Sequence, residues 1–118
     1  MADPSVSQFL QKRRSVLARN MVEPGPDADA LDTILSIGVR VPDHAKLAPW
    51  RLIVLKGDDR AELGAVAAQA VNAKNGQDEA AMRATESQQF MRAPCVIAVF
   101  ATPVEHPKIP AIEQILSA

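Results

Sequence analysis

The sequence is poor in the residues on which most protein-borne chemistry depends. Its 118 residues include one cysteine, so an internal disulfide and a thiolate metal cage are excluded. Its two histidines alone offer too few ligands for a good zinc site. Aromatic residues make up 3% and tyrosine is absent, which argues against stacking on single-stranded nucleic acid. The net charge of −1 gives no overall basic field. We therefore expect neither metal nor disulfide chemistry, and no nucleic-acid partner.

Long apolar runs are also missing. The longest, residues 93–101, contains a proline and has about half the length that a helix needs to span a bilayer. The N-terminal segment has Asp3 and other polar residues where a secretory leader would have a basic start and an apolar stretch. The sequence therefore predicts no membrane association and a cytoplasmic location.

The overall composition is that of a soluble, folded chain. Apolar residues make up 47% and charged residues 23%, close to the averages of globular proteins. A mass of 12.7 kDa suits one domain with one core, so residues 1–118 are expected to form a single domain.

Hydrophobic periodicity predicts an α+β fold with five helices and two strands. The strands are continuous apolar runs over residues 50–56 and 95–100, which are typical of buried strands and would place Trp50 in the core. The helices are expected from Asp3–Pro4 to about residue 11, from Asp27 to Gly38, over residues 61–73, over residues 78–91 after a break at Asn75–Gly76, and after Pro110.

Two features indicate that structure is missing from this set of elements. Two strands are fewer than a well-covered sheet usually has. The last helix places Ile112, Ile115 and Leu116 on one face, yet the sequence ends at Ala118 without a stop signal. We expect the remaining structure to come from a partner subunit or from residues outside this sequence.

Arg13, Arg14 and Ser15 follow the first helix directly. Guanidinium groups pair bidentately with phosphate oxygens, and a hydroxyl adds a further donor, so this triplet suits a phosphate. Cations at the C-terminal end of a helix are also favoured by its dipole alone, and that alternative stays open.

The stretch from Arg40 to Trp50 is dense in polar and stiff residues and lies between a helix and a strand. Such loops often carry function, and His44 could donate to a carbonyl or phosphate oxygen. A surface turn capped by Asp43 is the alternative. Cys95 lies within a strand, where it is interpreted as a small apolar residue rather than a nucleophile.

No nucleotide-binding glycine motif, serine-hydrolase elbow or paired-histidine helix occurs in the sequence. Donors suited to a phosphate are present, while nucleophiles and acid–base pairs are scarce. This balance is typical of a cofactor enzyme, in which the cofactor supplies the reactivity.

The ordered set of motifs from Ser7 to Ala118 resembles the FMN-dependent nitroreductase family, and within it the small YdjA-like branch. The matching elements, in order, are Phe9-Leu10, Arg13-Arg14-Ser15, Pro24, Leu31 to Gly38, Arg40-Val41-Pro42-Asp43-His44, Pro49-Trp50-Arg51, Arg92-Ala93-Pro94, Lys108-Ile109-Pro110 and Glu113-Gln114.

The resemblance implies a homodimer with an α+β fold, helices packed on a mixed central sheet, and FMN bound at the subunit interface. Arg13, Arg14 and Ser15 would contact the phosphate and ribityl end of FMN, while Arg40 and His44 would reach the FMN of the partner subunit. The implied activity is ping-pong transfer of hydride from NAD(P)H to a nitroaromatic, quinone or similar acceptor, with no protein nucleophile.

Two departures from the family pattern keep a second hypothesis open. The family usually has glutamine before the Pro-Trp pair, where this sequence has Ala48. Family members also continue for roughly another third beyond this sequence, with a long helix, further strands and FMN contacts. The alternative to an enzyme is a non-catalytic dimerising or flavin-binding remnant of the fold.

Overall fold

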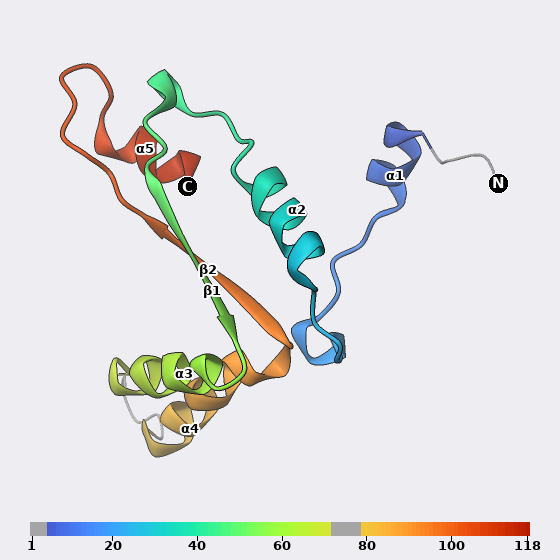
Figure 1. Ribbon diagram of the computed structural model, residues 1–118. Helices are drawn as coiled ribbons and strands as arrows, with labels where there is room; N and C mark the ends of the chain where they lie inside the picture. Colours follow the sequence, from blue (N-terminus) through green and yellow to red (C-terminus); the bar gives the residue numbers. More distant parts are fainter. Residues whose placement is uncertain (1–4, 72–78) are drawn as a thin grey trace.

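The computed structural model describes residues 5–71 and 79–118. Within them the chain is α+β, as predicted. Its elements, in order, are α1 (Val6–Lys12), η1 (Ala18–Asn20), α2 (Ala28–Gly38), η2 (His44–Lys46), β1 (Trp50–Lys56), α3 (Asp59–Gln69), α4 (Glu79–Gln89), η3 (Phe90–Arg92), β2 (Cys95–Ala101) and α5 (Ala111–Ser117), where η marks a short 3₁₀ turn (Figure 1).

The two predicted strands pair with each other. β1 and β2 are antiparallel, with a register that runs from Trp50 opposite Ala101 to Lys56 opposite Cys95. In the described part of the chain the sheet is thus antiparallel and two-stranded, and the expected mixed sheet is not seen. The expectation of buried strands is wrong as well, since Val99 of β2 is 53% exposed and Trp50 is half-buried. The physical reason is that a sheet of two strands is too small to be covered on both faces by the described helices.

The N-terminal ends of α1 and α2 are fixed by side-chain caps. Asp27 accepts a hydrogen bond from the Ala30 amide at 2.8 Å, so α2 begins where the sequence predicted. Ser5 caps α1 by accepting from the Gln8 amide at 3.3 Å. The start predicted at Asp3–Pro4 lies outside the described residues.

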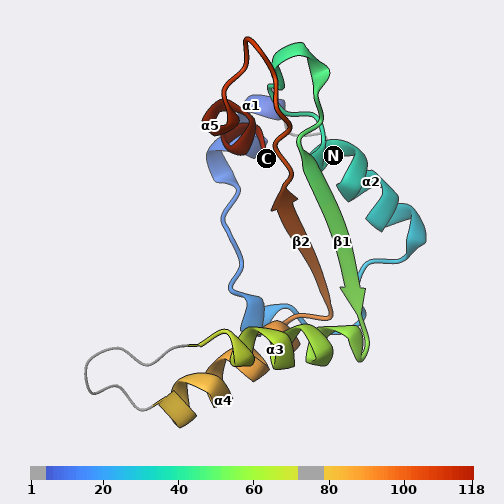
Figure 2. The same ribbon diagram turned by 90° about the vertical axis from the view of Figure 1, so that its left-hand side faces the viewer.

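α3 and α4 form a tight helical pair across one end of the strands (Figure 2). The crossing is close because Gly64 of α3 lies against the backbone of Ser87 in α4. Arg83 of α4 donates to the carbonyls of Ala68 at 2.5 Å and Val71 at 2.9 Å, which satisfies the C-terminal end of α3. α3 ends at Gln69, earlier than predicted, and the predicted break at Asn75–Gly76 is outside the described residues.

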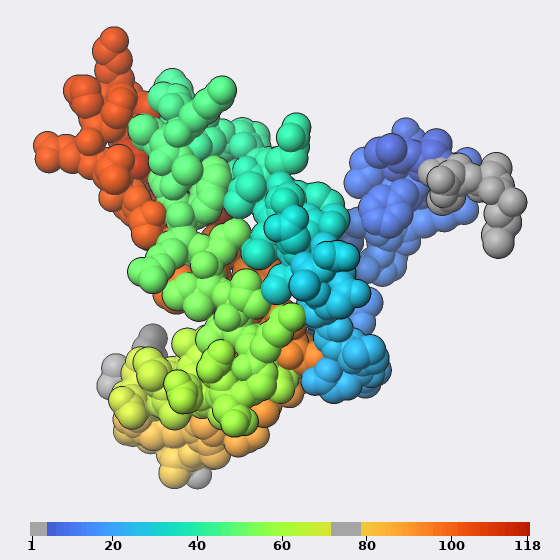
Figure 3. All heavy atoms as spheres, in the orientation of Figure 1, coloured from blue at the N-terminus to red at the C-terminus, as the bar shows by residue number. Residues whose placement is uncertain are grey.

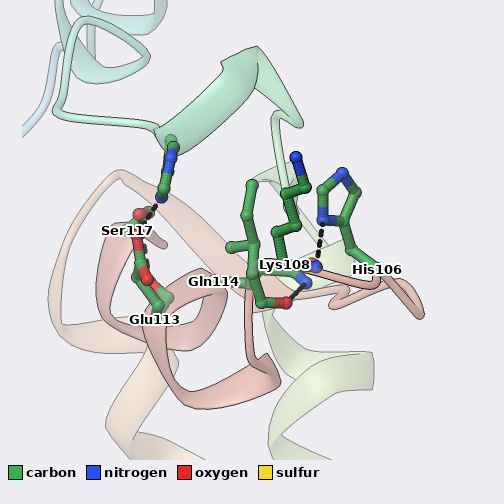
Figure 4. A network of polar contacts seen from close by, with 7 residues as sticks. His106, Lys108, Glu113, Gln114 and Ser117 are labelled. Atoms are coloured by element: carbon green, nitrogen blue, oxygen red, sulfur yellow. Dashed lines mark hydrogen bonds and ion pairs between the residues drawn. The ribbon is translucent and has the colours of Figure 1, made fainter.

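α5 is anchored by one buried polar side chain, Gln114, which is 2% exposed. Its Oε1 accepts a hydrogen bond from the Val104 amide at 2.8 Å. Its Nε2 donates to the carbonyl of Val104 at 2.8 Å and to that of Ile109 at 3.2 Å, so the buried carboxamide is fully hydrogen-bonded. On α5, Gln114 lies toward the preceding loop, while Glu113 and Ser117 lie together on another side (Figure 4). The predicted helix after Pro110 is therefore confirmed, and its orientation is set.

The molecule is open in shape. Its radius of gyration is 18.1 Å, whereas a compact domain of this length has about 13.5 Å. It exposes 9297 Å², compared with about 6,200 Å² for a compact monomer of this mass. The segment that carries α1 projects from the rest (Figure 3). Many large apolar side chains of the described residues are accordingly exposed to solvent.

None of the described helices is both long and apolar enough to cross a membrane.

Candidate functional site

The loop that joins α2 to β1, residues 39–49, is held by Asp43. Its carboxylate accepts a hydrogen bond from the Ala48 amide at 2.7 Å, and its carbonyl accepts from the Lys46 amide at 3.2 Å. Three residues adopt left-handed backbone conformations, with φ of 60° at Ala45, 55° at Lys46 and 47° at Ala48. Residues other than glycine rarely adopt this backbone conformation, because it is strained for a residue with a Cβ. Such strain is concentrated at functional sites.

His44 lies in this loop and contacts α5. Its Nδ1 is 2.5 Å from Oε1 of Glu113, so the imidazole and the carboxylate share a hydrogen bond. The His44 side chain is 60% exposed and that of Glu113 is 44% exposed, so both remain in contact with solvent. The hydroxyl of Ser117 donates to the Glu113 carbonyl at 3.2 Å, one turn further along α5 (Figure 4).

An open hollow of about 720 Å³ lies between the loop and α5. Its polar lining consists of Asp43, His44, Glu113 and Ser117, and its apolar lining includes Val41 and Leu116. The hollow therefore presents two carboxylates and one imidazole, and no arginine or lysine is among the described residues that line it.

The Arg13–Ser15 triplet follows α1 in extended conformation. The Arg13 amide donates to the Phe9 carbonyl at 2.8 Å and ends the helix, and Nη1 of Arg14 donates to the Arg13 carbonyl at 3.1 Å. All three residues are exposed. Among the described residues, no side chain pairs with the Arg13 guanidinium. Two guanidinium groups and a hydroxyl are thus available to an anion.

The structure does not bring the two predicted groups of site residues together within one chain. α1 stands apart from the α2–β1 loop and from α5 (Figure 1). Arg40 begins the loop, where its amide donates to the Ile37 carbonyl at 3.0 Å, and its side chain is exposed. Arg40 and His44 therefore share one loop, while Arg13, Arg14 and Ser15 lie elsewhere.

Glu113 was not singled out as a functional residue from the residue pattern. It lies 69 positions from His44 in the sequence, and a local sequence motif cannot predict a contact between residues that far apart. Cys95, which the sequence analysis interprets as a small apolar residue, is half-buried beside apolar residues such as Met21 and Pro94. Across residues 5–71 and 79–118, no cluster of histidine, cysteine and carboxylate side chains could hold a metal.

Comparison with known proteins gives consistent matches. The model of the nitroreductase family matches residues 10–116. The chain is 37% identical over 111 residues to "Putative NAD(P)H nitroreductase YdjA" of Escherichia coli K12, which covers 94% of this chain and 58% of that protein. It is 34% identical over 101 residues to "Putative NAD(P)H nitroreductase" of Haemophilus influenzae, covering 85% of this chain and 54% of that protein. The chain thus spans little more than half the length of these relatives.

Proposed function

The chain belongs to the nitroreductase family, and on that premise we propose that it is an FMN-dependent oxidoreductase that uses NAD(P)H to reduce nitroaromatic, quinone or similar acceptors. The observation that carries the proposal is the exposed set of donors at Arg13, Arg14 and Ser15, none of which forms an ion pair with a described residue. We further propose that residues 1–118 belong to one nitroreductase-like domain of a cytoplasmic homodimer.

The donor set fits the phosphate of FMN. A dianionic phosphate is best bound by guanidinium groups that offer paired N–H donors, and Arg13 and Arg14 present two such groups side by side in the sequence. Their exposure means that binding a phosphate breaks no ion pair within the described chain. Ser15 adds a hydroxyl that can donate to a phosphate oxygen or to a ribityl group.

When bound, FMN would supply the redox chemistry, by taking a hydride from NAD(P)H and passing electrons to the acceptor in ping-pong order. The residues of this chain then have to bind and orient. Arg40 would place a positive charge near the ring system, where negative charge develops on reduction. His44, held by Glu113, would supply a second contact from the same loop.

A homodimer would resolve the separation of the two groups of residues. α1 lies apart from the α2–β1 loop of the same chain (Figure 1), and a dimer could bring the two groups to one FMN from different subunits. The exposed surface supports this arrangement, because large apolar residues remain open to solvent on several elements, among them Phe9, Ile37 and Leu116.

The first test is the visible absorbance spectrum across the size-exclusion peak of the purified chain. We expect flavin absorbance to elute with a dimer, and the loaded protein to oxidise NAD(P)H when an acceptor is added. Flavin that elutes with the dimer without any turnover would favour the non-catalytic alternative. A colourless peak after incubation with FMN would contradict FMN binding by this chain.

Replacing Arg13 by alanine tests the phosphate contact. We expect the variant Arg13→Ala to weaken FMN binding by roughly 1.5 to 3 kcal/mol, the range for a hydrogen bond to a charged group. The readout is a titration that follows the quenching of FMN fluorescence. Arg51→Ala is the matched control, because Arg51 is an exposed arginine on β1 outside the proposed site. Equal FMN affinity in both variants would remove Arg13 from the site.

A further inference from the structure

We infer that Glu113 is a positioning residue for His44, and that it makes Nε2 of His44 a hydrogen-bond acceptor for a hydroxyl or N–H group of the cofactor. This inference rests on the proposed function. It differs from the expectation that His44 donates to a carbonyl or phosphate oxygen.

The direction of the hydrogen bond follows from the partners. A glutamate carboxylate has no N–H or O–H group and can only accept a hydrogen bond. With Nδ1 of His44 only 2.5 Å from Oε1 of Glu113, the hydrogen between them must belong to Nδ1. A neutral imidazole carries a single hydrogen, so Nε2 is left with a lone pair.

The lining of the hollow points to the same kind of ligand group. The charged side chains around it are the carboxylates of Asp43 and Glu113. The Asp43 carboxylate already accepts a hydrogen bond from the Ala48 amide and Glu113 already bonds Nδ1 of His44, so Nε2 of His44 is one acceptor of the lining that no described residue uses. A phosphate would be repelled by this lining, whereas a hydroxyl or N–H donor would be accepted. The structure thus separates two roles: Arg13 and Arg14 for the phosphate, and His44 for a donor group.

His106 provides an internal reference. Its Nδ1 accepts a hydrogen bond from the Lys108 amide at 3.2 Å, so its hydrogen must lie on Nε2 (Figure 4). The two histidines of the chain are therefore expected to have opposite tautomers. Long-range ¹H–¹⁵N correlation spectra distinguish these tautomers in neutral rings, and the variant His106→Gln assigns the signals.

The experiment compares the wild-type chain with Glu113→Ala, Glu113→Gln and the control Glu105→Ala, at about pH 8.5, where an ordinary histidine is neutral. Glu105 is an exposed carboxylate in the loop before α5. We expect the Nδ1–H tautomer of His44 in the wild type, in Glu105→Ala and in Glu113→Gln, which keeps a carbonyl acceptor. We expect it to be lost in Glu113→Ala. The far-ultraviolet circular dichroism of each variant reports folding.

The same variants are titrated with FMN. We expect Glu113→Ala to bind FMN roughly 3- to 10-fold more weakly than Glu105→Ala, which corresponds to one neutral hydrogen bond, and Glu113→Gln to restore most of the affinity. An Nε2–H or doubly protonated His44 in the wild type, or a tautomer unchanged in Glu113→Ala, would overturn the inference. Equal FMN affinity of Glu113→Ala and Glu105→Ala would overturn its ligand part. Absence of FMN binding in the wild type would instead overturn the proposed function, and the tautomers would still decide the role of Glu113.

Discussion

Asp43 is the residue on which the geometry of the candidate site depends most directly. It holds Ala48 and Lys46 through its carboxylate and its carbonyl, and both of these residues have positive φ. Left-handed conformations cost about 1–2 kcal/mol for residues with a Cβ, so the two hydrogen bonds of Asp43 have to offset that cost. The loop is thereby kept in one conformation, with His44 next to Glu113.

We expect Asp43→Ala to lower the free energy of unfolding by about 1–3 kcal/mol, because the Ala48 amide loses its partner while the strained backbone remains. Chemical denaturation followed by circular dichroism measures the loss. Asp32→Ala is the matched control, since Asp32 is an exposed carboxylate on α2 with no hydrogen bond among the described residues. If Asp43→Ala is no less stable than Asp32→Ala, the loop does not depend on this bond.

The sequence predicts single residues well where their partners are close along the chain. The sequence predicts a helix start near Asp27 and offers a turn capped by Asp43 as one alternative for the loop, because side chains bond amides a few positions away in recurring patterns. Glu113 was not foreseen as the partner of His44, because their contact depends on the path of 69 intervening positions. Its position next to Gln114 in a recognised motif was the one available signal.

At the scale of elements, the pairing of α3 with α4 depends on one glycine. A Cβ added to Gly64 would collide with the backbone oxygen of Ser87 and lie 3.0 Å from its carbonyl carbon. Both of these atoms belong to the backbone of α4, so neither can move aside without a shift of the whole helix.

Gly64→Ala should therefore lower stability by about 1–3 kcal/mol or more, despite the higher helix propensity of alanine. Gly38→Ala is the control, because Gly38 ends α2 and a Cβ there would meet no atom within 4 Å. We expect that variant to be neutral or more stable by up to about 1 kcal/mol. Thermal unfolding of the two variants checks the difference, and equal midpoints would mean that α3 and α4 do not pack as described.

Element types were predicted more reliably than their ends or their burial. Both strands and the helices α2 and α5 lie where the hydrophobic pattern indicated. α3 ends before its alanine-rich sequence does, because Arg83 from the next helix binds its terminal carbonyls. Trp50 was expected in the core and is half-buried, since burial depends on which elements cover the strands rather than on the pattern within them.

At the scale of the whole molecule, apolar residues with the spacing of a buried face are exposed to solvent. Ile112 and Leu116 of α5 have the spacing of a buried face, yet they are 62% and 80% exposed. The sequence predicts which side chains seek burial, but it does not specify the surface that covers them. A subunit interface would use this surface and would also bring the Arg13–Ser15 triplet next to the Arg40–His44 loop of a second chain.

Mixing two variants that each bind FMN weakly tests whether one FMN site draws on two subunits. In the double variant Arg13→Ala/Arg14→Ala the phosphate contact is lost, and in His44→Ala the loop contact is lost. In a mixed dimer, one site carries both defects, whereas the other combines the intact arginines of one chain with the intact His44 of its partner. Random mixing makes about half of the dimers mixed, so about a quarter of all sites should regain the FMN affinity of the wild type.

The measurement is an FMN titration of the two variants after joint unfolding and refolding, compared with the same variants refolded separately and then combined on ice. We expect a tight class of sites only after joint refolding, because chains can exchange only then. The control is a mixture of Arg13→Ala/Arg14→Ala with Arg51→Ala, in which Arg51 lies outside both groups. In that mixture each Arg51→Ala chain still supplies intact arginines and an intact His44, so tight sites are present before any exchange and joint refolding should not raise their number. If both groups instead belonged to one chain, each site of a mixed dimer would retain one defect, and joint refolding would restore no tight sites.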